Sequence, residues 1–306
     1  MRRAFVEALT DLARKDPAVV FLTGDLGFQV FDDFKARFGP RYINVGIAEA
    51  ELACAGAGLA REGFRPFVYS IASFMTGRAY ELLRIAVAYP RLPVVVVGAG
   101  GGYCYSTTGV THHSPDDVGL MSLLPGMTVT VPGDPTEVRA LLPQLAALPG
   151  PSYIRIGKFG EPSYESPAPV TLGRARLLRR GEKVAILSFG EMASVALEAA
   201  KSLEAEGMRP WVHQFHTLKP IDTGALEEIS AEAHTLVIVE ETSPMGGLHR
   251  AVTERLCGSA RRPTLIRLGP PDELALGSPR RETLRRRWGF DAEATAQACR
   301  RAWKAV

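Results

Sequence analysis

The sequence predicts an α/β protein with two doubly wound domains, each built on a parallel sheet that helices cover. Short apolar runs alternate with amphipathic segments of helical length, and this alternation stops once, between residues 159 and 182. Strands of a parallel sheet are buried on both faces, so they read as continuous apolar runs, and each needs a crossover to reach the next. The 306 residues are also enough for two hydrophobic cores.

The first domain is predicted to span residues 1–158. Each predicted strand is an apolar, β-branched run, and each predicted helix is an amphipathic segment between two such runs. The predicted helices are 2–14, 46–61, 74–88 and 135–147, and the predicted strands are 19–23, a run ending near Ser70, 92–98 and 127–131. Residues 132–137 (PGDPTE) form a turn signal followed by a capped helix start.

Residues 159–182 are predicted to be a linker, because Pro, Ser and Gly are frequent in their first half and no periodicity is present. The alternation resumes in the second domain, residues 183–306. Its predicted elements are strands at 184–188 and 236–240 and helices at 191–206, 223–230 and 246–257. The basic run 280–287 is interpreted as a solvated helix face, with an anion-binding or partner-binding patch as the alternative.

Composition excludes several classes of protein. The formal net charge of +3 is too small to indicate a nucleic acid or a membrane surface as partner. No apolar run reaches the ~18–20 residues of a membrane helix, and no signal segment is visible. The four cysteines form no CxxC pair, which argues against a disulfide framework or a zinc site. We therefore expect a cytoplasmic α/β enzyme.

Glu49 lies in the most unusual stretch, residues 44–60, which is dominated by small and apolar side chains after Glu51. Such a helix is expected to be buried on most sides, and a buried carboxylate is costly unless it is bonded. One interpretation is that Glu49 shares a proton with a ligand nitrogen. The other is that it stabilises the helix dipole from the first turn, and Glu51 could fill either role.

A glycine-rich loop, residues 98–113, follows an apolar strand and is predicted to lie where ligands bind in open α/β sheets. His112 and His113 precede two aspartates, which is a conceivable metal-ligand set. Adjacent side chains in an extended chain point apart, however, so no metal site is predicted on this chain. From the residues alone, the sequence indicates an enzyme with a site around Glu49 and this loop.

A set of motifs in fixed order over nearly the whole chain resembles the C-terminal half of transketolases. It is most similar to the C-terminal subunit of split transketolases, in which two shorter chains make one enzyme that depends on thiamine diphosphate (TPP). The motifs are 24–25 (GD), 44–49 (NVGIAE), Phe74 with 78–79 (RA), 109–113 (GVTHH), 116–117 (DD), 124–125 (LP), 132–134 (PGD), 153–155 (YIR), 218–222 (LKPID) and 239–248 (VEETSPMGGL).

This resemblance implies that the first domain binds the TPP pyrimidine and that the second is a transketolase C-terminal-type domain. It implies that Glu49 hydrogen-bonds N1′ of the pyrimidine and activates the cofactor, and that His112 acts beside the reacting sugar hydroxyls. Phe74, which from its residue type alone fits a core position better, becomes the aromatic platform for the pyrimidine. The other implied residues are Asp25 and Arg78 for the cofactor, and Thr108, Lys158, Arg2 and Gln29, with His112, for the substrate.

The chain lacks the Gly-Asp-Gly motif with which TPP enzymes hold Mg²⁺ and diphosphate, because Leu26 follows Gly24 and Asp25. The resemblance therefore implies a separate N-terminal, diphosphate-binding subunit and an α2β2 heterotetramer that transfers a two-carbon ketol unit from a ketose, expected to be phosphorylated, to an aldose. Thr108 stands where family members that act on phosphorylated sugars commonly have an acidic residue. The resemblance therefore does not identify the donor and acceptor sugars. The alternatives are a subunit like 1-deoxyxylulose-5-phosphate synthase or 2-oxoacid dehydrogenase E1β, and a non-catalytic assembly or regulatory paralogue.

Overall fold

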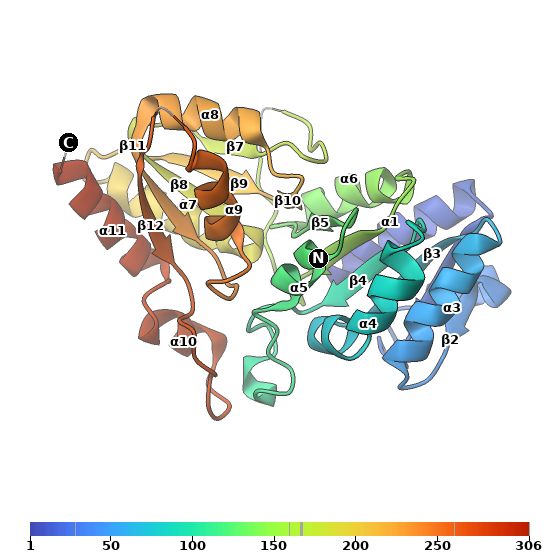
Figure 1. Cartoon of the computed structure of the whole chain (residues 1–306). Helices are drawn as coiled ribbons and strands as arrows, with labels where there is room; N and C mark the ends of the chain where they lie inside the picture. Colours follow the sequence, from blue (N-terminus) through green and yellow to red (C-terminus); the bar gives the residue numbers. More distant parts are fainter. Residues whose placement is uncertain (28, 159, 166–167, 260, 306) are drawn as a thin grey trace.

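The computed structural model describes residues 1–27, 29–158, 160–165, 168–259 and 261–305. It shows two α/β lobes, each with a mostly parallel sheet between layers of helices (Figure 1). The predicted fold class is confirmed. Residues 159, 166 and 167 of the predicted linker lie outside the described part of the chain. Every helix in the described part is too short or too polar to cross a lipid bilayer.

The described residues of the first sheet form seven strands in the order β10-β5-β6-β4-β3-β1-β2. All neighbours are parallel except β10, which is antiparallel to β5. Those strands are β1 (Val19–Thr23), β2 (Tyr42–Asn44), β3 (Arg65–Ile71), β4 (Val95–Ala99), β5 (Thr128–Thr130), β6 (Ser152–Ile156) and β10 (Thr217–Lys219). The carboxyl ends of β1, β3 and β4 therefore meet at one edge of the sheet, and the loops that follow them hold the candidate site.

Alternation along the strands divides the core of this sheet into two layers. In β4, Val95 and Val97 pack on one face with α1, α2 and α6, while Val96 packs on the other face with α3. Both faces are buried, which explains the continuous apolar runs. The helices are α1 (Arg2–Lys15), α2 (Asp32–Phe38), η1 (Gly39–Arg41), α3 (Glu49–Arg61), η4 (Ser106–Thr108), α5 (Asp117–Leu123) and α6 (Pro135–Ala146).

The single helix predicted at 74–88 is three segments in the structure. Two are π-helical, η2 (Phe74–Arg78) and η3 (Leu83–Ala88), and the short α4 (Tyr80–Leu82) joins them. The wider π turn is rare and occurs most often at functional sites. Here it sets the spacing of Phe74 and Arg78, two of the residues that the sequence singles out.

Five strands of the described residues form the second sheet in the order β12-β11-β8-β9-β7. They are β7 (Arg176–Arg179), β8 (Lys183–Phe189), β9 (Trp211–Phe215), β11 (Ala233–Val239) and β12 (Thr264–Leu268). The helices around it are η5 (Gly190–Met192), α7 (Ala193–Glu204), α8 (Thr223–Glu232), α9 (Leu248–Leu256), α10 (Arg281–Arg287) and α11 (Ala292–Lys304). The strand β7 lies inside the predicted linker. It is a strand because it pairs with β9 in the antiparallel sense, and the local sequence gives no signal of this pairing.

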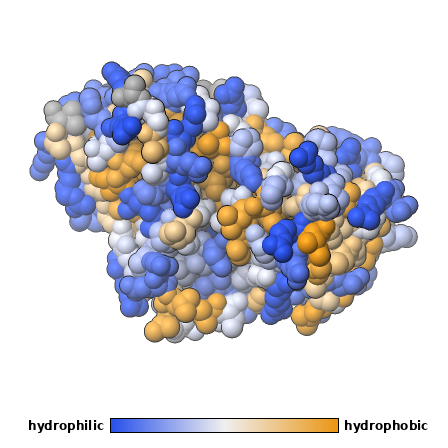
Figure 2. Space-filling view, viewed as in Figure 1, coloured by the Kyte–Doolittle hydropathy of each residue, from blue (hydrophilic) through white to orange (hydrophobic). Residues whose placement is uncertain are grey.

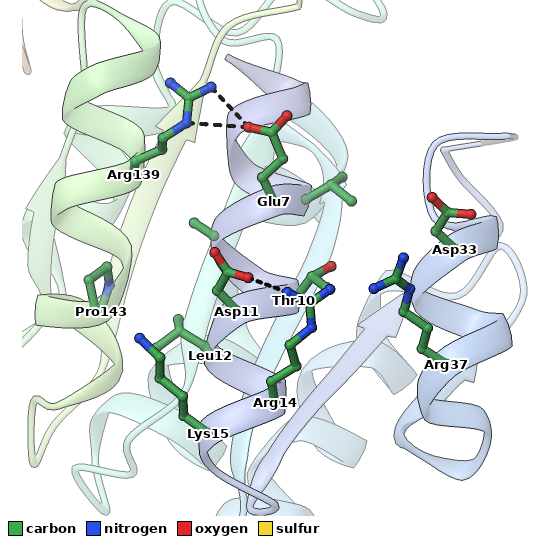
Figure 3. Close-up of a pocket in the computed structure, with 12 residues that line it drawn as sticks. Glu7, Thr10, Asp11, Leu12, Arg14, Lys15, Asp33, Arg37, Arg139 and Pro143 are labelled. Atoms are coloured by element: carbon green, nitrogen blue, oxygen red, sulfur yellow. Dashed lines mark hydrogen bonds and ion pairs between the residues drawn. The ribbon is translucent and has the colours of Figure 1, made fainter.

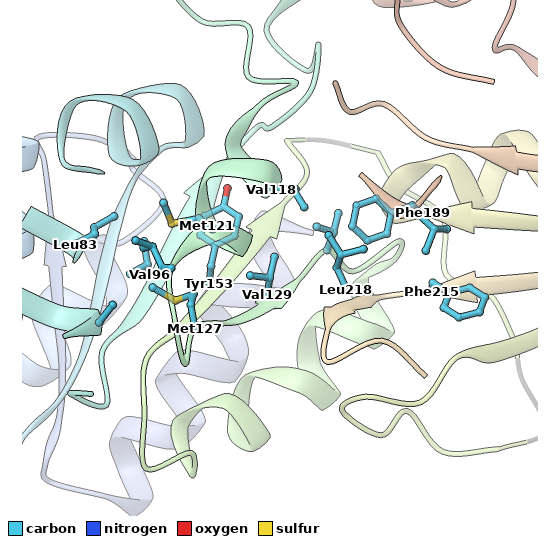
Figure 4. Close-up of a cluster of buried hydrophobic side chains, with 14 of the residues drawn as sticks. Leu83, Val96, Val118, Met121, Met127, Val129, Tyr153, Phe189, Phe215 and Leu218 are labelled. Atoms are coloured by element: carbon cyan, nitrogen blue, oxygen red, sulfur yellow. The ribbon is translucent and has the colours of Figure 1, made fainter. Parts of the chain in front are cut away.

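The two lobes share one hydrophobic cluster. Residues of both sheets belong to it, including Val96 and Val129 of the first lobe and Phe189 and Leu218 of the second (Figure 4). The second lobe also lends β10 to the first sheet, and Lys219 Nζ donates to the Ser122 and Leu124 carbonyls at 2.8 and 2.7 Å. The lobes are thus joined through a strand and a core.

The solvated-face interpretation of residues 280–287 is wrong for two of the arginines. Arg281 and Arg285 stand four residues apart on α10, so they share one helix face, and both bind the buried carboxylate of Glu241 at 2.8 Å. Burial alone would raise the pKa of Glu241, but the two guanidinium groups outweigh it and lower that pKa to about 2. Glu241 also accepts from the Tyr103 amide at 2.7 Å, which ties the glycine-rich loop to the second lobe.

Candidate functional site

Glu49 begins α3 and is buried, with 3% of its surface exposed, whereas Glu51 is exposed. Its Oε1 accepts from Ser70 Oγ at 3.2 Å, and its Oε2 lies 3.2 Å from Arg78 Nη1. The helix approaches the sheet closely because Gly56 has no side chain: a Cβ there would lie 2.6 Å from Val68. Glu49 is therefore the buried carboxylate of this stretch. Glu51, which is exposed, does not fill that role.

Phe74 lies between two other predicted residues. The Arg78 guanidinium is 4.4 Å from the centre of the Phe74 ring, and the His112 ring is 5.0 Å from it at an interplanar angle of 64°. The π turn of η2 brings Arg78 back over Phe74 while Arg78 also reaches Glu49. Three segments distant in sequence thus converge: the start of α3, η2, and the loop that carries His112.

His112 and His113 lie in different surroundings, although His112 stands in a turn and not in the extended chain that the prediction assumed. His113 is buried, with its ring 5.1 Å from that of Tyr103 and Nε2 3.1 Å from the Ser106 carbonyl oxygen. His112 Nδ1 is 2.9 Å from Thr111 Oγ1. Burial lowers the pKa of His112, and His113, Arg78 and Lys158 lower it further. The imidazole is therefore neutral at neutral pH and able to accept a proton.

Two predicted substrate residues meet on one aromatic ring. Arg2 Nη2 donates to the Tyr105 hydroxyl at 3.1 Å, and Lys158 Nζ lies 4.3 Å from the centre of the Tyr105 ring. That ring is 5.9 Å from the ring of His112. Sequence reasoning missed Tyr105, although its place inside the glycine-rich loop was a usable signal. Thr108, three residues further on, is exposed in η4.

Asp25 lies on the loop after β1 and adopts a φ of +56°. Its amide donates to Asn44 Oδ1 at 3.0 Å and its Oδ1 accepts from Asn44 Nδ2 at 2.9 Å, so this turn is fastened to the 44–49 motif. Gly24 packs beside the Ser70 hydroxyl that donates to Glu49. Gln29 is exposed on the same loop, and within the described residues no hydrogen bond or ring contact joins it to the group around Glu49 and His112.

Asp117 is occupied by protein partners. It is buried and accepts from Tyr153 Oη at 2.5 Å and from Arg155 Nε at 2.9 Å. Across the described residues, no group of three or more His, Cys, Asp or Glu side chains is arranged to hold a metal ion.

A hollow of about 550 Å³ lies elsewhere, between α1, α2 and α6 (Figure 3). Charged side chains line much of it, and Arg139 pairs with Glu7 across it at 2.9 Å. Its lining includes none of the residues that surround Glu49 or His112. This hollow is therefore separate from the candidate site, which is defined by the convergence of the predicted residues.

The loops that carry the site also expose apolar side chains. Ile47, two residues before Glu49, is 78% exposed, and Val110, two residues before His112, is 50% exposed. Leu274 and Leu276 are exposed on the loop before α10, where the space-filling view shows an apolar patch at the lower edge (Figure 2). Val110 and Leu274 line one hollow, and exposed apolar surface gathered in this way marks interaction sites.

Two family profiles match the chain: "Transketolase, pyrimidine binding domain" over residues 1–159 and "Transketolase, C-terminal domain" over residues 173–294. An apulose-4-phosphate transketolase subunit of Phocaeicola vulgatus is 33% identical over 276 residues, which cover 89% of this chain and 88% of that protein. The 6-deoxy-6-sulfo-D-fructose transketolase subunit SqwH of Clostridium sp. (strain MSTE9) is 37% identical over 258 residues, 84% of this chain and 80% of that one.

A solved structure described as "Split gene transketolase, inactive beta4 tetramer" has a TM-score of 0.88 and 35% identity, over 98% of this chain and 97% of that chain. The 1-deoxy-D-xylulose-5-phosphate synthase of Chlorobium luteolum is 34% identical over 96% of this chain, which spans 47% of that enzyme. With both family profiles matched and two subunit-sized relatives above 30% identity along most of their length, the chain belongs to the transketolase family.

Proposed function

We propose that this chain is the C-terminal subunit of a split, TPP-dependent transketolase that transfers a two-carbon ketol unit from a ketose to an aldose. The observation that supports it best is the convergence of a buried carboxylate, an aromatic ring and a neutral imidazole at Glu49, Phe74 and His112. The subunit-sized relatives named as transketolase subunits support the same proposal.

The residues fit the pyrimidine part of TPP. Glu49 offers a carboxylate that is almost shut off from water, and a buried carboxylate needs a donor such as a ring N–H. Phe74 offers a flat aromatic face on which a planar group, the Arg78 guanidinium, now lies 4.4 Å from the ring centre. When bound, TPP supplies the nucleophilic carbon that carries the ketol unit. In this proposal Glu49 holds the proton at the pyrimidine nitrogen and Phe74 holds the ring plane, with Asp25 on the neighbouring turn.

On the substrate side, the neutral imidazole of His112 is suited to take a proton from a sugar hydroxyl and return it. Lys158 and Arg2, which meet at Tyr105 beside His112, supply positive charge for the phosphate of a sugar. The name of one relative, an apulose-4-phosphate transketolase subunit, supports a phosphorylated ketose. We assign Thr108 and Gln29 to the rim that contacts the remainder of the sugar.

We assign the diphosphate and Mg²⁺ to a separate N-terminal subunit, because the sequence lacks the Gly-Asp-Gly motif. The exposed Ile47 and Val110 support a partner that covers the site. The neighbour described as an inactive β4 tetramer supports a requirement for a second kind of chain. The proposed assembly is an α2β2 heterotetramer. The proposed compartment is the cytoplasm, and this proposal rests on the composition of the sequence.

The test is to purify the chain alone and together with the diphosphate-binding subunit, and to measure Mg²⁺-dependent TPP binding and ketol transfer in both samples. We expect both activities only in the mixed sample, and we expect Glu49→Gln to lower ketol transfer by about 10²-fold or more. Tight TPP binding by the chain alone would exclude the split-subunit proposal. Condensation of pyruvate with glyceraldehyde 3-phosphate, without ketol transfer, would favour the synthase-like alternative.

A further inference from the structure

Arg78 makes two contacts with one flat group. One edge of its guanidinium donates to Glu49 Oε2 at 3.2 Å, and the guanidinium carbon lies 4.4 Å from the centre of the Phe74 ring. A guanidinium is planar, cationic and lined with N–H donors at its edge. It therefore satisfies a carboxylate and an aromatic face together, in the manner of a protonated heteroaromatic ring.

These two partners leave little room for a second occupant. Glu49 has one oxygen bonded to Ser70 and the other to Arg78. The Phe74 ring has the guanidinium 4.4 Å from its centre, and the His112 ring lies 5.0 Å away at a steep angle. A planar ligand that stacks on the face of Phe74 covered by the guanidinium, and donates to Glu49 Oε2, would have to take the place of the guanidinium.

We propose that Arg78 is a displaceable occupant of the pyrimidine half-site, which fills the position of the aminopyrimidine ring until TPP arrives. This inference rests on the proposed function. The side chain of Arg78 is 57% exposed, so it can swing into solvent without unfolding its helix. While it is in place it keeps the buried carboxylate of Glu49 paired, which matters because an unpaired buried charge is strongly destabilising.

Occupancy by Arg78 has a consequence for affinity. When the competent form of a site is only partly populated, the apparent Kd rises by the inverse of that fraction. Removal of the guanidinium is therefore expected to tighten TPP binding to the assembled enzyme. A half-exposed cation–π contact and ion pair together correspond to about a 3-fold to 30-fold change.

The experiment is calorimetric titration of TPP into the complex with the diphosphate-binding subunit, in the presence of Mg²⁺, for the wild type, Arg78→Ala and Arg78→Lys. We expect a lower Kd for both variants, with the smaller change in Arg78→Lys, which keeps a cation near Glu49 but has no flat face. Arg84→Ala removes an exposed arginine from the adjoining η3 and is expected to leave Kd unchanged. Weaker or unchanged binding in Arg78→Ala would overturn the inference and make Arg78 a cofactor ligand or a bystander.

A second measurement uses free guanidinium ion as a competitor of TPP. Guanidinium chloride at non-denaturing, millimolar concentration should compete with TPP in Arg78→Ala, where the position is open, and should have little effect in the wild type, with sodium chloride as the control. Competition of equal size in both proteins would contradict the inference. If the wild-type complex binds no TPP at all, the proposed function fails, and that result is distinct from either outcome above.

Discussion

Arg176 of β7 reaches into the first lobe and forms a buried ion pair with Glu137 of α6 at 2.8 Å. The same guanidinium nitrogen lies 3.1 Å from Asp134, the residue that caps α6 by accepting from the Glu137 amide. One cation from the second lobe therefore pairs with two carboxylates at the start of a helix in the other. The arrangement links the helix cap to the docking of the lobes.

Arg176→Ala is expected to lower the free energy of unfolding by about 3–5 kcal/mol, because loss of one partner leaves the buried carboxylates uncompensated. Urea denaturation at neutral pH measures the change. Arg3→Ala removes an exposed arginine that pairs with Glu7 and should cost no more than about 1 kcal/mol. Equal effects of the two substitutions would contradict the buried-pair argument.

The stability of the chain should depend on pH through Glu241. The pKa of this carboxyl is lowered to about 2 in the folded chain, and it rises to its ordinary value of about 4.5 on unfolding. Stabilisation is therefore complete above pH 4.5 and is lost as the pH falls toward 2. Between these limits the free energy of unfolding should fall by about 1.4 kcal/mol per pH unit more steeply in the wild type than in Glu241→Gln. Parallel slopes in a series of urea titrations would contradict this.

His112 is expected to act as its neutral form. Because the folded-state pKa of His112 lies below 6.5, the imidazole carries no charge at pH 7. Activity should therefore fall only as the pH drops below 6.5. His112→Gln should reduce kcat by about 10²–10⁴-fold and flatten the acid limb of the pH profile. The exposed His234, replaced in the same way, serves as the control and should change neither. An unaltered acid limb in His112→Gln would assign that limb to another group.

Gly98 is tightly packed at the start of the glycine-rich loop. A Cβ at this position would overlap the hydroxyl of the buried Tyr153, which donates to Asp117. Gly98→Ala should lower the free energy of unfolding by about 1–3 kcal/mol through overpacking. Gly58, exposed in α3 with no neighbour within 4 Å of a Cβ, is the matched control, and Gly58→Ala should stabilise the helix by up to about 1 kcal/mol. Thermal unfolding of both variants separates the two cases.

Apolar periodicity identified the strands that are buried on both faces, such as β1 and β4, because burial itself dictates their composition. It did not identify β10, whose three residues become a strand only through β5 of the other lobe. The π turns around Phe74 were also unforeseen, since a π segment has the same apolar spacing as an imperfect α-helix.

For the site, residue type and place in the chain were sufficient to single out the first turn of α3 and the loop with His112. They could not decide between Glu49 and Glu51, because both stand in the first turn of α3 and differ only in tertiary burial. They also could not indicate that Tyr105 receives Arg2 and Lys158, which come from opposite ends of the first lobe. Long-range contacts of this kind have no local signature.

The strand β10 also covers one edge of the first sheet. A fragment that ends at residue 159, where the first family profile stops, would keep Glu49, Phe74 and His112. It would leave unpaired the backbone groups on the side of β5 that faces away from β6. An uncovered strand edge is a template for another chain. In the intact protein that edge is closed by a strand of three residues followed by Pro220, which has no N–H to offer. By covering this edge, the second lobe thus prevents the first sheet from pairing edge to edge with other chains, as strands do in fibres.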